Sequence, residues 1–381
     1  RVSQRDQFAL ADQDLASLPL FEKAIKPSQP LMRRIHGLWG IGQLGQKNPS
    51  ALNSLTSLIG DEEMEIRANL ARTLGNHGKH LAPFRKALIA MLDDSSPRVA
   101  SLAAIALSNH GHKDAIEPAI KLLEKNDDKD VVLRHAGIMV LTKCANFAPD
   151  WRYFDHHSTA VRRAIVIALR RHKSHLLETY FGDRDQSVRQ EAIRAAYEMD
   201  VRKTYPALSN QAHNIALRVS PEIKWHPLTA RRAIFAAWVL GQEKDAEVIA
   251  KIAADPKVDF RTRKDALIAL LEWNNPPVPD PVTGFARTLP KNRIKLDSSI
   301  IKDLEGLLDG IDKSSLDRIP RALTLSEQDQ IPLGELRLTR YLKNEKYPEE
   351  ARVKSMKLLS PLKESSSVWP FTLQKLFADK S

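Results

Sequence analysis

Residues 65–78 read "EIRANLARTLGNHG", and residues 98–111 read "RVASLAAIALSNHG". At an offset of 33 residues (98 minus 65), both stretches end in Asn-His-Gly, and each follows an aspartate four residues upstream, Asp61 and Asp94. Within them, aliphatic and small residues recur at spacings of three and four, which is the pattern of an amphipathic helix. A repeat of this length predicts a helix–turn–helix unit that buries its apolar face only by stacking on its neighbours.

Looser copies of the second helix follow along the chain: "DKDVVLRHAGIMVLTKCA" (128–145), "TAVRRAIVIALRRHKS" (159–174), "RDQSVRQEAIRAAYEMD" (184–200), "TARRAIFAAWVLGQ" (229–242) and "VDFRTRKDALIALLEW" (258–273). Other stretches with helical periodicity lie between the copies, at residues 49–60, 81–93, 115–125 and 244–254. The unit is therefore a helix pair of roughly 27–34 residues. Its second helix carries alanine where neighbouring helices must approach closely.

The pattern resembles HEAT repeats, D-x-x-x-x-V-R-x-x-A-x-x-A-L-G, over about residues 28–273. This resemblance implies an all-α fold, a right-handed α-solenoid of the HEAT or armadillo type (an α-α superhelix). Asp61, Asp94 and Asp128 occupy the acidic position of the repeat. An acid there can cap a helix N-terminus, and it can also meet an arginine of the adjacent repeat.

Four segments are expected. Residues 1–27 form an N-terminal helix or cap, and residues 28–273 form a solenoid of about seven to eight helix pairs. Residues 274–296 form a proline-rich ordered loop or linker, because five prolines between 276 and 290 exclude a regular helix. Residues 297–381 contain C-terminal helices at 298–311, 331–343 and 348–359 and a last short helix, which continue or cap the solenoid.

Residues 40–45, "GIGQLG", match the dinucleotide-binding pattern G-x-G-x-x-G, and Asp61 lies 19 residues beyond Gly42. That fingerprint needs a strand before it and a helix that starts at it. Here the surrounding "LMRRIHGLWGIGQL" is itself periodic like a helix. We expect these glycines, like Gly75 and Gly241 in later repeats, to end the second helix in a left-handed conformation. The related Trp238 is expected in the core.

Cysteine content and motifs argue against most catalytic classes. The single cysteine, Cys144, excludes a disulfide framework, a thiolate metal cluster and C-x-x-C-H haem attachment within this chain, and we expect it in the core. The patterns G-x-S-x-G, P-loop and H-E-x-x-H do not occur. Asp155-His156-His157 is similar to a phosphoesterase motif but falls in an inter-helix turn. We therefore predict no catalytic, cofactor-binding or metal-binding residue, and no stretch reaches the ~18–20 apolar residues of a membrane span.

Histidines are the best candidates for metal ligands in this sequence. His77 and His80 fall in one repeat turn and His110 and His112 in the next, so stacking could gather them on one edge. A metal site also needs a carboxylate or other supporting partner, which this spacing lacks. We expect surface histidines rather than a metal site.

Basic residues suggest an anionic partner. The net charge is +11, and residues 151–240 hold 15 Lys and Arg against 8 Asp and Glu. Second helices usually line the concave surface of a solenoid, so arginines opposite the apolar stripe could bind a phosphate backbone, an acidic protein or a propionate-bearing haem domain. The candidate partner-surface residues are Arg162, Arg163, Arg170, Arg189, Arg194, Arg231 and Arg232. The alternative is that several of them pair with repeat aspartates such as Asp183 and Asp185.

Two stretches, "LMRRIHGLWGIGQLG" (31–45) and "ALIALLEWNNPPVPDPVTGFARTLP" (266–290), resemble the HEAT region of large planctomycete- and verrucomicrobium-type membrane-bound dehydrogenase-like proteins. The resemblance implies a β-propeller before this region and a cytochrome c-like haem domain after it, so any haem belongs to the parent protein. The chain also begins at Arg1 without Met, and we expect an excised middle segment. The compartment is then extracytoplasmic; without the resemblance, a cytoplasmic protein is expected.

Three functions fit the sequence. The first is a non-catalytic scaffold that docks other domains of the parent chain or another protein. The second is nucleic-acid binding, as in the HEAT-like alkylpurine DNA glycosylases, which have a basic concave face. The third is an enzyme partner or lyase, as in HEAT-like proteins that attach bilin chromophores, and only the fold supports it. The missing catalytic motifs favour the scaffold.

Overall fold

The computed structural model describes residues 4–80, 82–218, 225–255, 257–274, 276–296, 319–320, 323, 333 and 335–360. This part of the chain is all-α; it contains no strand, and its one isolated β-bridge joins Pro279 and Ala286. Stacked helices form two compact units, Arg1–Thr179 with Asp183–Glu191 and Tyr180–Gly182 with Ala192–Ser381. The expected HEAT-like α-solenoid class is confirmed. None of the described helices combines the length and the apolar character needed to cross a membrane.

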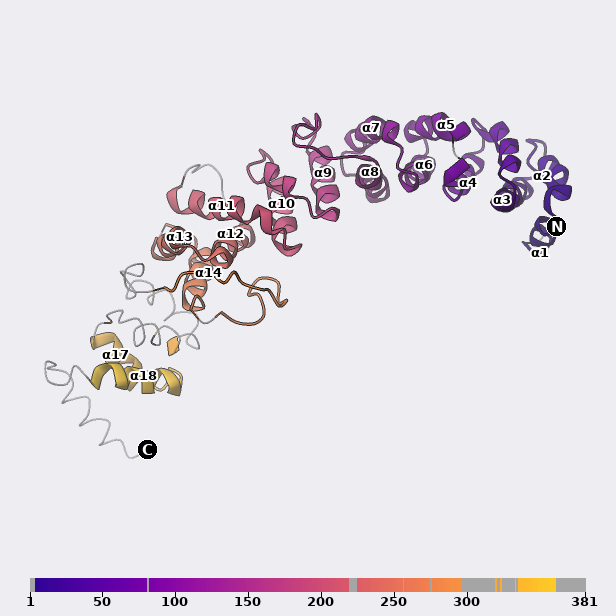
Figure 1. Ribbon diagram of the computed structural model, residues 1–381. Helices are drawn as coiled ribbons and strands as arrows, with labels where there is room; N and C mark the ends of the chain where they lie inside the picture. Colours follow the sequence, from indigo (N-terminus) through magenta and orange to yellow (C-terminus); the bar gives the residue numbers. More distant parts are fainter. Residues whose placement is uncertain are drawn as a thin grey trace. The chain divides into compact units, whose positions relative to one another are not determined.

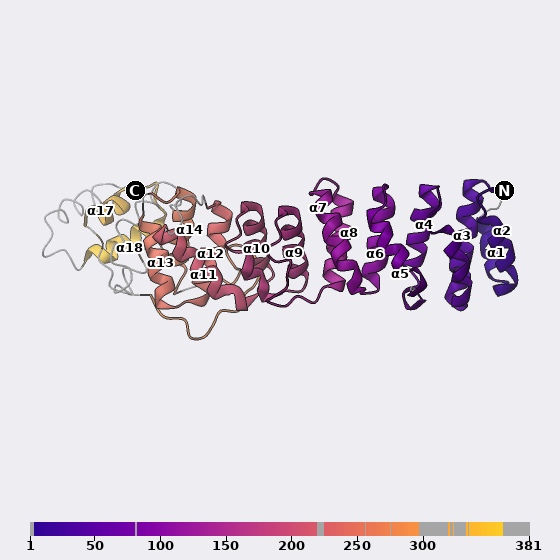
Figure 2. The same cartoon turned by 90° about the horizontal axis from the view of Figure 1, so that it is seen from above.

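In unit 1 the second helices of the repeats pack one on the next in a single layer (Figures 1 and 2). They are α3 (Leu31–Lys47), α4 (Met64–Leu74), α6 (Pro97–Asn109), α8 (Val131–Cys144) and α9 (Thr159–Arg171). The other layer contains α5 (Arg85–Ala90), α7 (Ile116–Asn126) and a 3-10 helix at Pro49–Leu58, while α1 (Gln4–Ala11) and α2 (Leu18–Ala24) pack against α3.

Small side chains allow this close stacking. Ala68, Ala71, Ala103 and Ala136 on successive second helices are fully buried, as the repeat pattern predicts. Cys144 at the end of α8 is also buried, and burial raises the pKa of its thiol to about 11. A thiol in this setting packs as a small apolar group, so the core position expected for it is confirmed.

Several first helices differ from expectation. Residues 49–58 form a 3-10 helix, and within residues 82–93 the short α5 lies between 3-10 turns at Ala82–Phe84 and Met91–Asp93. Between α8 and α9 the described chain forms a loop instead of a first helix. Phe147 in this loop packs on Trp151 with ring centroids 4.9 Å apart, and Trp151 packs on Phe154 at 5.6 Å. These rings supply the apolar contact that a helix provides in the neighbouring repeats.

The glycines of residues 40–45 lie inside α3, which continues to Lys47. The prediction that they end the helix in a left-handed conformation is wrong, because none of them has a positive φ. They permit close approach instead: an added Cβ would lie 2.2 Å from the Phe21 ring at Gly40 and 2.4 Å from Leu52 at Gly45. A phosphate-binding loop is excluded because the segment is helical throughout. Gly75 also ends its helix with right-handed φ (−56°), whereas Gly241 caps α12 as predicted, with φ +67°.

Besides Tyr180–Gly182, unit 2 contains the C-terminal part of α10 (Gln186–Glu198). It continues through α11 (Tyr205–Leu217), α12 (Pro227–Leu240), α13 (Glu243–Ala254) and α14 (Phe260–Leu271). Further along the chain, α17 (Glu335–Lys343) packs on α18 (Glu349–Leu359). The limits of these two helices are similar to those expected, 331–343 and 348–359. The helices expected at 298–311 and after residue 360 lie outside the described residues. The four expected domain limits stay a prediction.

The proline-rich loop packs on the helices of unit 2. The Arg293 guanidinium lies 4.9 Å from the Trp238 ring and 5.1 Å from the Trp273 ring, and it donates to the backbone carbonyls of both. Burial lowers the pKa of Arg293 to about 10. Trp238 is 2% exposed, so the core position predicted for it is confirmed. Gly241 is needed twice here, for its positive φ and because an added Cβ would lie 2.4 Å from Arg293 Cγ.

We expect Gly40→Ala to lower the free energy of unfolding by about 1–3 kcal/mol, because the new methyl group overlaps the buried Phe21 ring. This loss exceeds the gain of up to about 1 kcal/mol in helix propensity. Urea unfolding followed by circular dichroism measures the change. The control is Gly182→Ala, where an added Cβ meets nothing within 4 Å. Equal midpoints for Gly40→Ala and Gly182→Ala would contradict the close-packing role.

Candidate partner surface and the turn network

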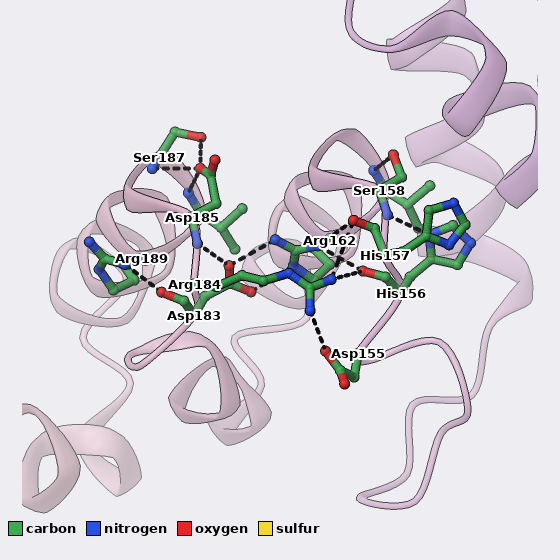
Figure 3. A network of polar contacts seen from close by, with 12 residues as sticks. Asp155, His156, His157, Ser158, Arg162, Asp183, Arg184, Asp185, Ser187 and Arg189 are labelled. Atoms are coloured by element: carbon green, nitrogen blue, oxygen red, sulfur yellow. Dashed lines mark hydrogen bonds and ion pairs between the residues drawn. The ribbon is translucent and has the colours of Figure 1, made fainter.

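The polar network in Figure 3 is centred on Arg162 of α9, whose side chain is almost fully buried. Its Nε and Nη2 donate to the two carboxylate oxygens of Asp183 at 2.8 and 3.0 Å. Its Nη1 donates to the carbonyls of His156 and His157 at 2.7 and 3.0 Å. One guanidinium thus joins the turn before its own helix to the turn of the next repeat.

The turn that contains Asp183 also contributes a second arginine to the contact between the two turns. Arg184 donates to the same carbonyls, of His156 and His157, at 3.2 and 3.3 Å. Asp183 in turn accepts the amide of Asp185 through its carboxylate, and its backbone carbonyl accepts from Arg189 at 2.5 Å. The two turns in Figure 3 are therefore joined both by an ion pair and by hydrogen bonds from arginine side chains to backbone carbonyls.

An ion pair between an arginine of one repeat and the aspartate of the next occurs twice earlier in unit 1. Arg34 of α3 pairs with Asp61, and both side chains are nearly buried. Arg67 of α4 donates to both carboxylate oxygens of Asp94 at 2.7 and 2.9 Å and to the Asp61 carbonyl at 2.7 Å. The hydrogen bond to Arg67 lowers the pKa of Asp94. The interpretation of Asp61 and Asp94 as inter-repeat acids is thus confirmed.

The series is interrupted in the middle of unit 1. Ala100 stands 33 residues after Arg67, at the arginine position of the third repeat. Asp128 pairs instead with Arg134 of its own repeat at 3.7 Å and with Arg163 at 3.2 Å. His156 precedes Arg162 by six residues, as Asp61 precedes Arg67, so a histidine replaces the acid of that turn.

The arginines predicted to form a partner surface are mostly engaged within the protein. In unit 1, Arg162 is 1% exposed and cannot face a partner, which corrects that prediction. Arg163 pairs with Asp128, Arg170 pairs with Glu191 at 3.4 Å, and Arg189 donates to a turn carbonyl. Arg162 pairs with Asp183, which is the alternative that the sequence left open. Asp185 instead accepts the amides of Ser187 and Val188.

The three predicted arginines of unit 2 also have partners. Arg232 pairs with Glu198 at 2.6 Å, and Arg231 lies 3.6 Å from Asp265 while donating to the Pro281 carbonyl at 2.6 Å. Arg194 is engaged as well. Because the predicted residues are divided between two units, their convergence in one groove stays a prediction.

Arg231 nevertheless borders a cleft of about 480 Å³ at the N-terminal ends of α12 and α14. Residues that line it include Pro227, Leu228, Arg231, Arg261, Lys264 and Asp265. The sequence reasoning missed Arg261 and Lys264, although "FRTRKDALIALL" (260–271) shows three basic residues, Arg261, Arg263 and Lys264, at the start of a helical stretch.

In the described part of the chain, one group brings three metal-type ligands together: Glu124, His156 and His157, with ligand atoms within 4.8 Å of one another. The Ser158 amide donates to His156 Nδ1 at 3.1 Å, so in the neutral ring Nε2 carries the hydrogen and has no free lone pair. His157 Nε2 lies 2.5 Å from Glu124, as in a hydrogen-bonded pair. These residues do not fit a metal. The histidines at 77, 80, 110 and 112 form no such group either; His110 Nε2 lies 3.1 Å from the Gly75 carbonyl.

No protein-family model and no curated protein matches the sequence. Solved structures that resemble the chain include the complex of CpcE and CpcF of phycocyanin lyase from Nostoc sp. PCC7120, with 21% identity, 67% of this chain and 87% of that chain covered, and a TM-score of 0.31. Human deoxyhypusine hydroxylase in complex with glycerol has 17% identity, coverages of 85% and 98%, and a TM-score of 0.27. An engineered protein has 15% identity, coverages of 95% and 92%, and a TM-score of 0.32. At these values the likeness says nothing of activity or partners.

We expect Asp94→Asn to lower the free energy of unfolding by about 1–3 kcal/mol at pH 7, because the guanidinium of Arg67 loses its charged partner. The pKa of Asp94 is lower in the folded state than its ordinary value of 3.8. Its contribution is therefore complete above that ordinary value and is lost as the pH falls through the lowered folded value. Thermal unfolding of wild type and variant, followed from pH 7 to about pH 2, should show two midpoints that converge in acid.

The neighbouring Asp93→Asn is the matched control. Asp93 is 84% exposed and pairs with the exposed Lys125, so its removal should shift the midpoint only slightly. The inter-repeat role of Asp94 is contradicted if both variants lose the same stability, or if the Asp94→Asn deficit persists unchanged in acid.

Proposed function

We propose that this chain is a non-catalytic helical-repeat scaffold that holds other domains of its parent protein, or another protein, in fixed positions. The observation that carries the proposal is the set of arginine–aspartate bonds across successive turns. Arg34–Asp61, Arg67–Asp94 and Arg162–Asp183 each fix one repeat against the next with little solvent exposure. A preorganised surface loses less conformational freedom on binding, which is what docking requires.

The arginine pairing also supports a protein partner over a nucleic acid. An arginine whose charge is already balanced by a carboxylate gains less from a phosphate than a free arginine does. Arg163, Arg170 and Arg232 all have carboxylate partners within 3.4 Å. The basic middle of the sequence therefore offers fewer free cations than its composition suggests.

We further propose that the chain is the HEAT segment of a planctomycete- and verrucomicrobium-type membrane-bound dehydrogenase-like, cytochrome c-containing protein. The two stretches that resemble this family are α3 and α14 with the loop that follows it. Under this proposal the redox chemistry belongs to a propeller and a haem domain elsewhere in the parent protein. The compartment is then extracytoplasmic.

The complete gene and its neighbouring domains test these proposals. We expect the reading frame to encode a β-propeller before Arg1 and a C-x-x-C-H motif after Ser381. The flanking domains, produced separately, should bind this chain in isothermal titration calorimetry. A reading frame without either element would overturn the family assignment. Absence of heat with every flanking domain would overturn docking within the parent chain.

Duplex DNA binding separates the scaffold from the nucleic-acid alternative. We expect only weak binding of a short fluorescent duplex in fluorescence anisotropy, because the charges of the paired arginines are already balanced by carboxylates. Tight binding at ~50 mM salt that falls by ~10³-fold at ~200 mM would instead establish a nucleic-acid-binding function.

A further inference from the structure

We propose that the cleft between the N-terminal ends of α12 and α14 binds an acidic peptide segment that also carries apolar side chains. The proposal rests on the scaffold function and names the chemistry of its partner. The cleft lies entirely within unit 2 and encloses about 480 Å³. This volume is within the range of pockets that take small ligands or a few side chains.

An apolar side chain that lines the cleft, Leu228, is exposed to solvent. Leu228 in the first turn of α12 is 55% exposed, and Phe260, which begins α14 beside Arg261, is 49% exposed. Among other second helices, α9 and α10 begin with the polar Thr159 and Gln186, whereas α4 and α8 begin with the exposed Met64 and Val131. The first turn of these helices therefore accepts polar and apolar residues alike, because a side chain there leans toward the helix N-terminus. Leu228 thus leaves apolar surface open in the cleft that the buried Ile268 also lines.

The cations of the cleft are not balanced by anions. Arg231 pairs with Asp265 and donates to the Pro281 carbonyl. Asp265 is the one carboxylate that lines the cleft, and it is therefore already paired. Arg261 is exposed and Lys264 is half-buried, and neither has an ion-pair partner in the described part of the chain. The carboxylate of Asp259 is directed to the Thr262 amide as the cap of α14. Two positive charges therefore remain available to a ligand.

An acidic, apolar peptide satisfies both features at once. Its Asp or Glu side chains would pair with Arg261 and Lys264, and an adjacent Leu or Phe would cover Leu228. The N-terminal ends of α12 and α14 carry partial positive charge, which adds to the attraction for carboxylates. A nucleic acid fits less well, because two free cations neutralise few phosphates and the sugar–phosphate backbone gains nothing from Leu228.

Fluorescence anisotropy with defined probes tests the proposal on the full chain. The probes are a short fluorescein-labelled peptide of alternating acidic (Asp, Glu) and apolar (Leu, Phe) pairs, the same peptide with every apolar residue replaced by Ser, and single-stranded oligo-dT. The charge variant combines Arg261→Glu with Lys264→Glu. Its matched control combines Lys244→Glu with Lys251→Glu on α13, which changes the net charge equally at exposed positions outside the cleft.

We expect the acidic-apolar peptide to bind the wild type at least about tenfold more tightly than the serine peptide. The Arg261→Glu/Lys264→Glu variant should lose about tenfold or more in affinity for the acidic-apolar peptide, and the α13 control should lose much less. Leu228→Ser should reduce the difference in affinity between the acidic-apolar peptide and the serine peptide. Circular dichroism melts verify that all variants fold.

Three results would overturn the proposal: no saturable binding of the acidic-apolar peptide, equal losses in the two charge variants, or equal binding of the serine peptide. Binding of oligo-dT with the same dependence on Arg261 and Lys264 would assign the cleft to nucleic acid instead. A negative result here leaves docking of the flanking domains intact, since calorimetry with those domains tests the scaffold separately.

Discussion

The hydrogen-bonded ion pair between an arginine of one repeat and an aspartate of the next is the interaction on which unit 1 depends. A stacked helix pair can slide on its neighbour, because apolar packing has little directionality. A guanidinium that donates to a carboxylate and to a backbone carbonyl fixes direction and distance together. At Arg67 and Arg162 the same group bonds its own turn and the next one, so each turn is placed relative to both.

The interruption of this series explains the irregular middle of unit 1. With Ala100 at one arginine position and His156 at one acidic position, two links are missing there. The aromatic loop of Phe147, Trp151 and Phe154 lies in the same region and supplies contact of a different kind. Asp128 meanwhile takes two arginines, Arg134 and Arg163, so a carboxylate without its usual partner still receives balancing charge.

Sequence periodicity predicted the helix-repeat class, the second helices and the acidic positions, because those depend on local pattern alone. It failed at Gly40 and Gly45, since glycine is unfavourable inside a helix and usually marks a helix end. Only the close approach of Phe21 and Leu52 explains why glycine is needed within α3. It also overestimated the free basic surface. The pairing of Arg163 with Asp128, 35 residues away, depends on how repeats stack, which composition does not reveal. The two cations of the cleft that have no ion-pair partner among the described residues, Arg261 and Lys264, lie outside the most basic stretch.

The loop of residues 276–296 looks like a linker in the sequence, yet its Arg293 fills the space between Trp238 and Trp273. These tryptophans are 2% and 1% exposed, and the Arg293 side chain lies against both rings. A recombinant fragment that stops at residue 273 would therefore leave two large indole rings open to water and prone to aggregation. The proline-rich stretch is thus an unsuitable place to divide this protein for expression, and any smaller soluble piece of unit 2 has to extend at least through residue 296.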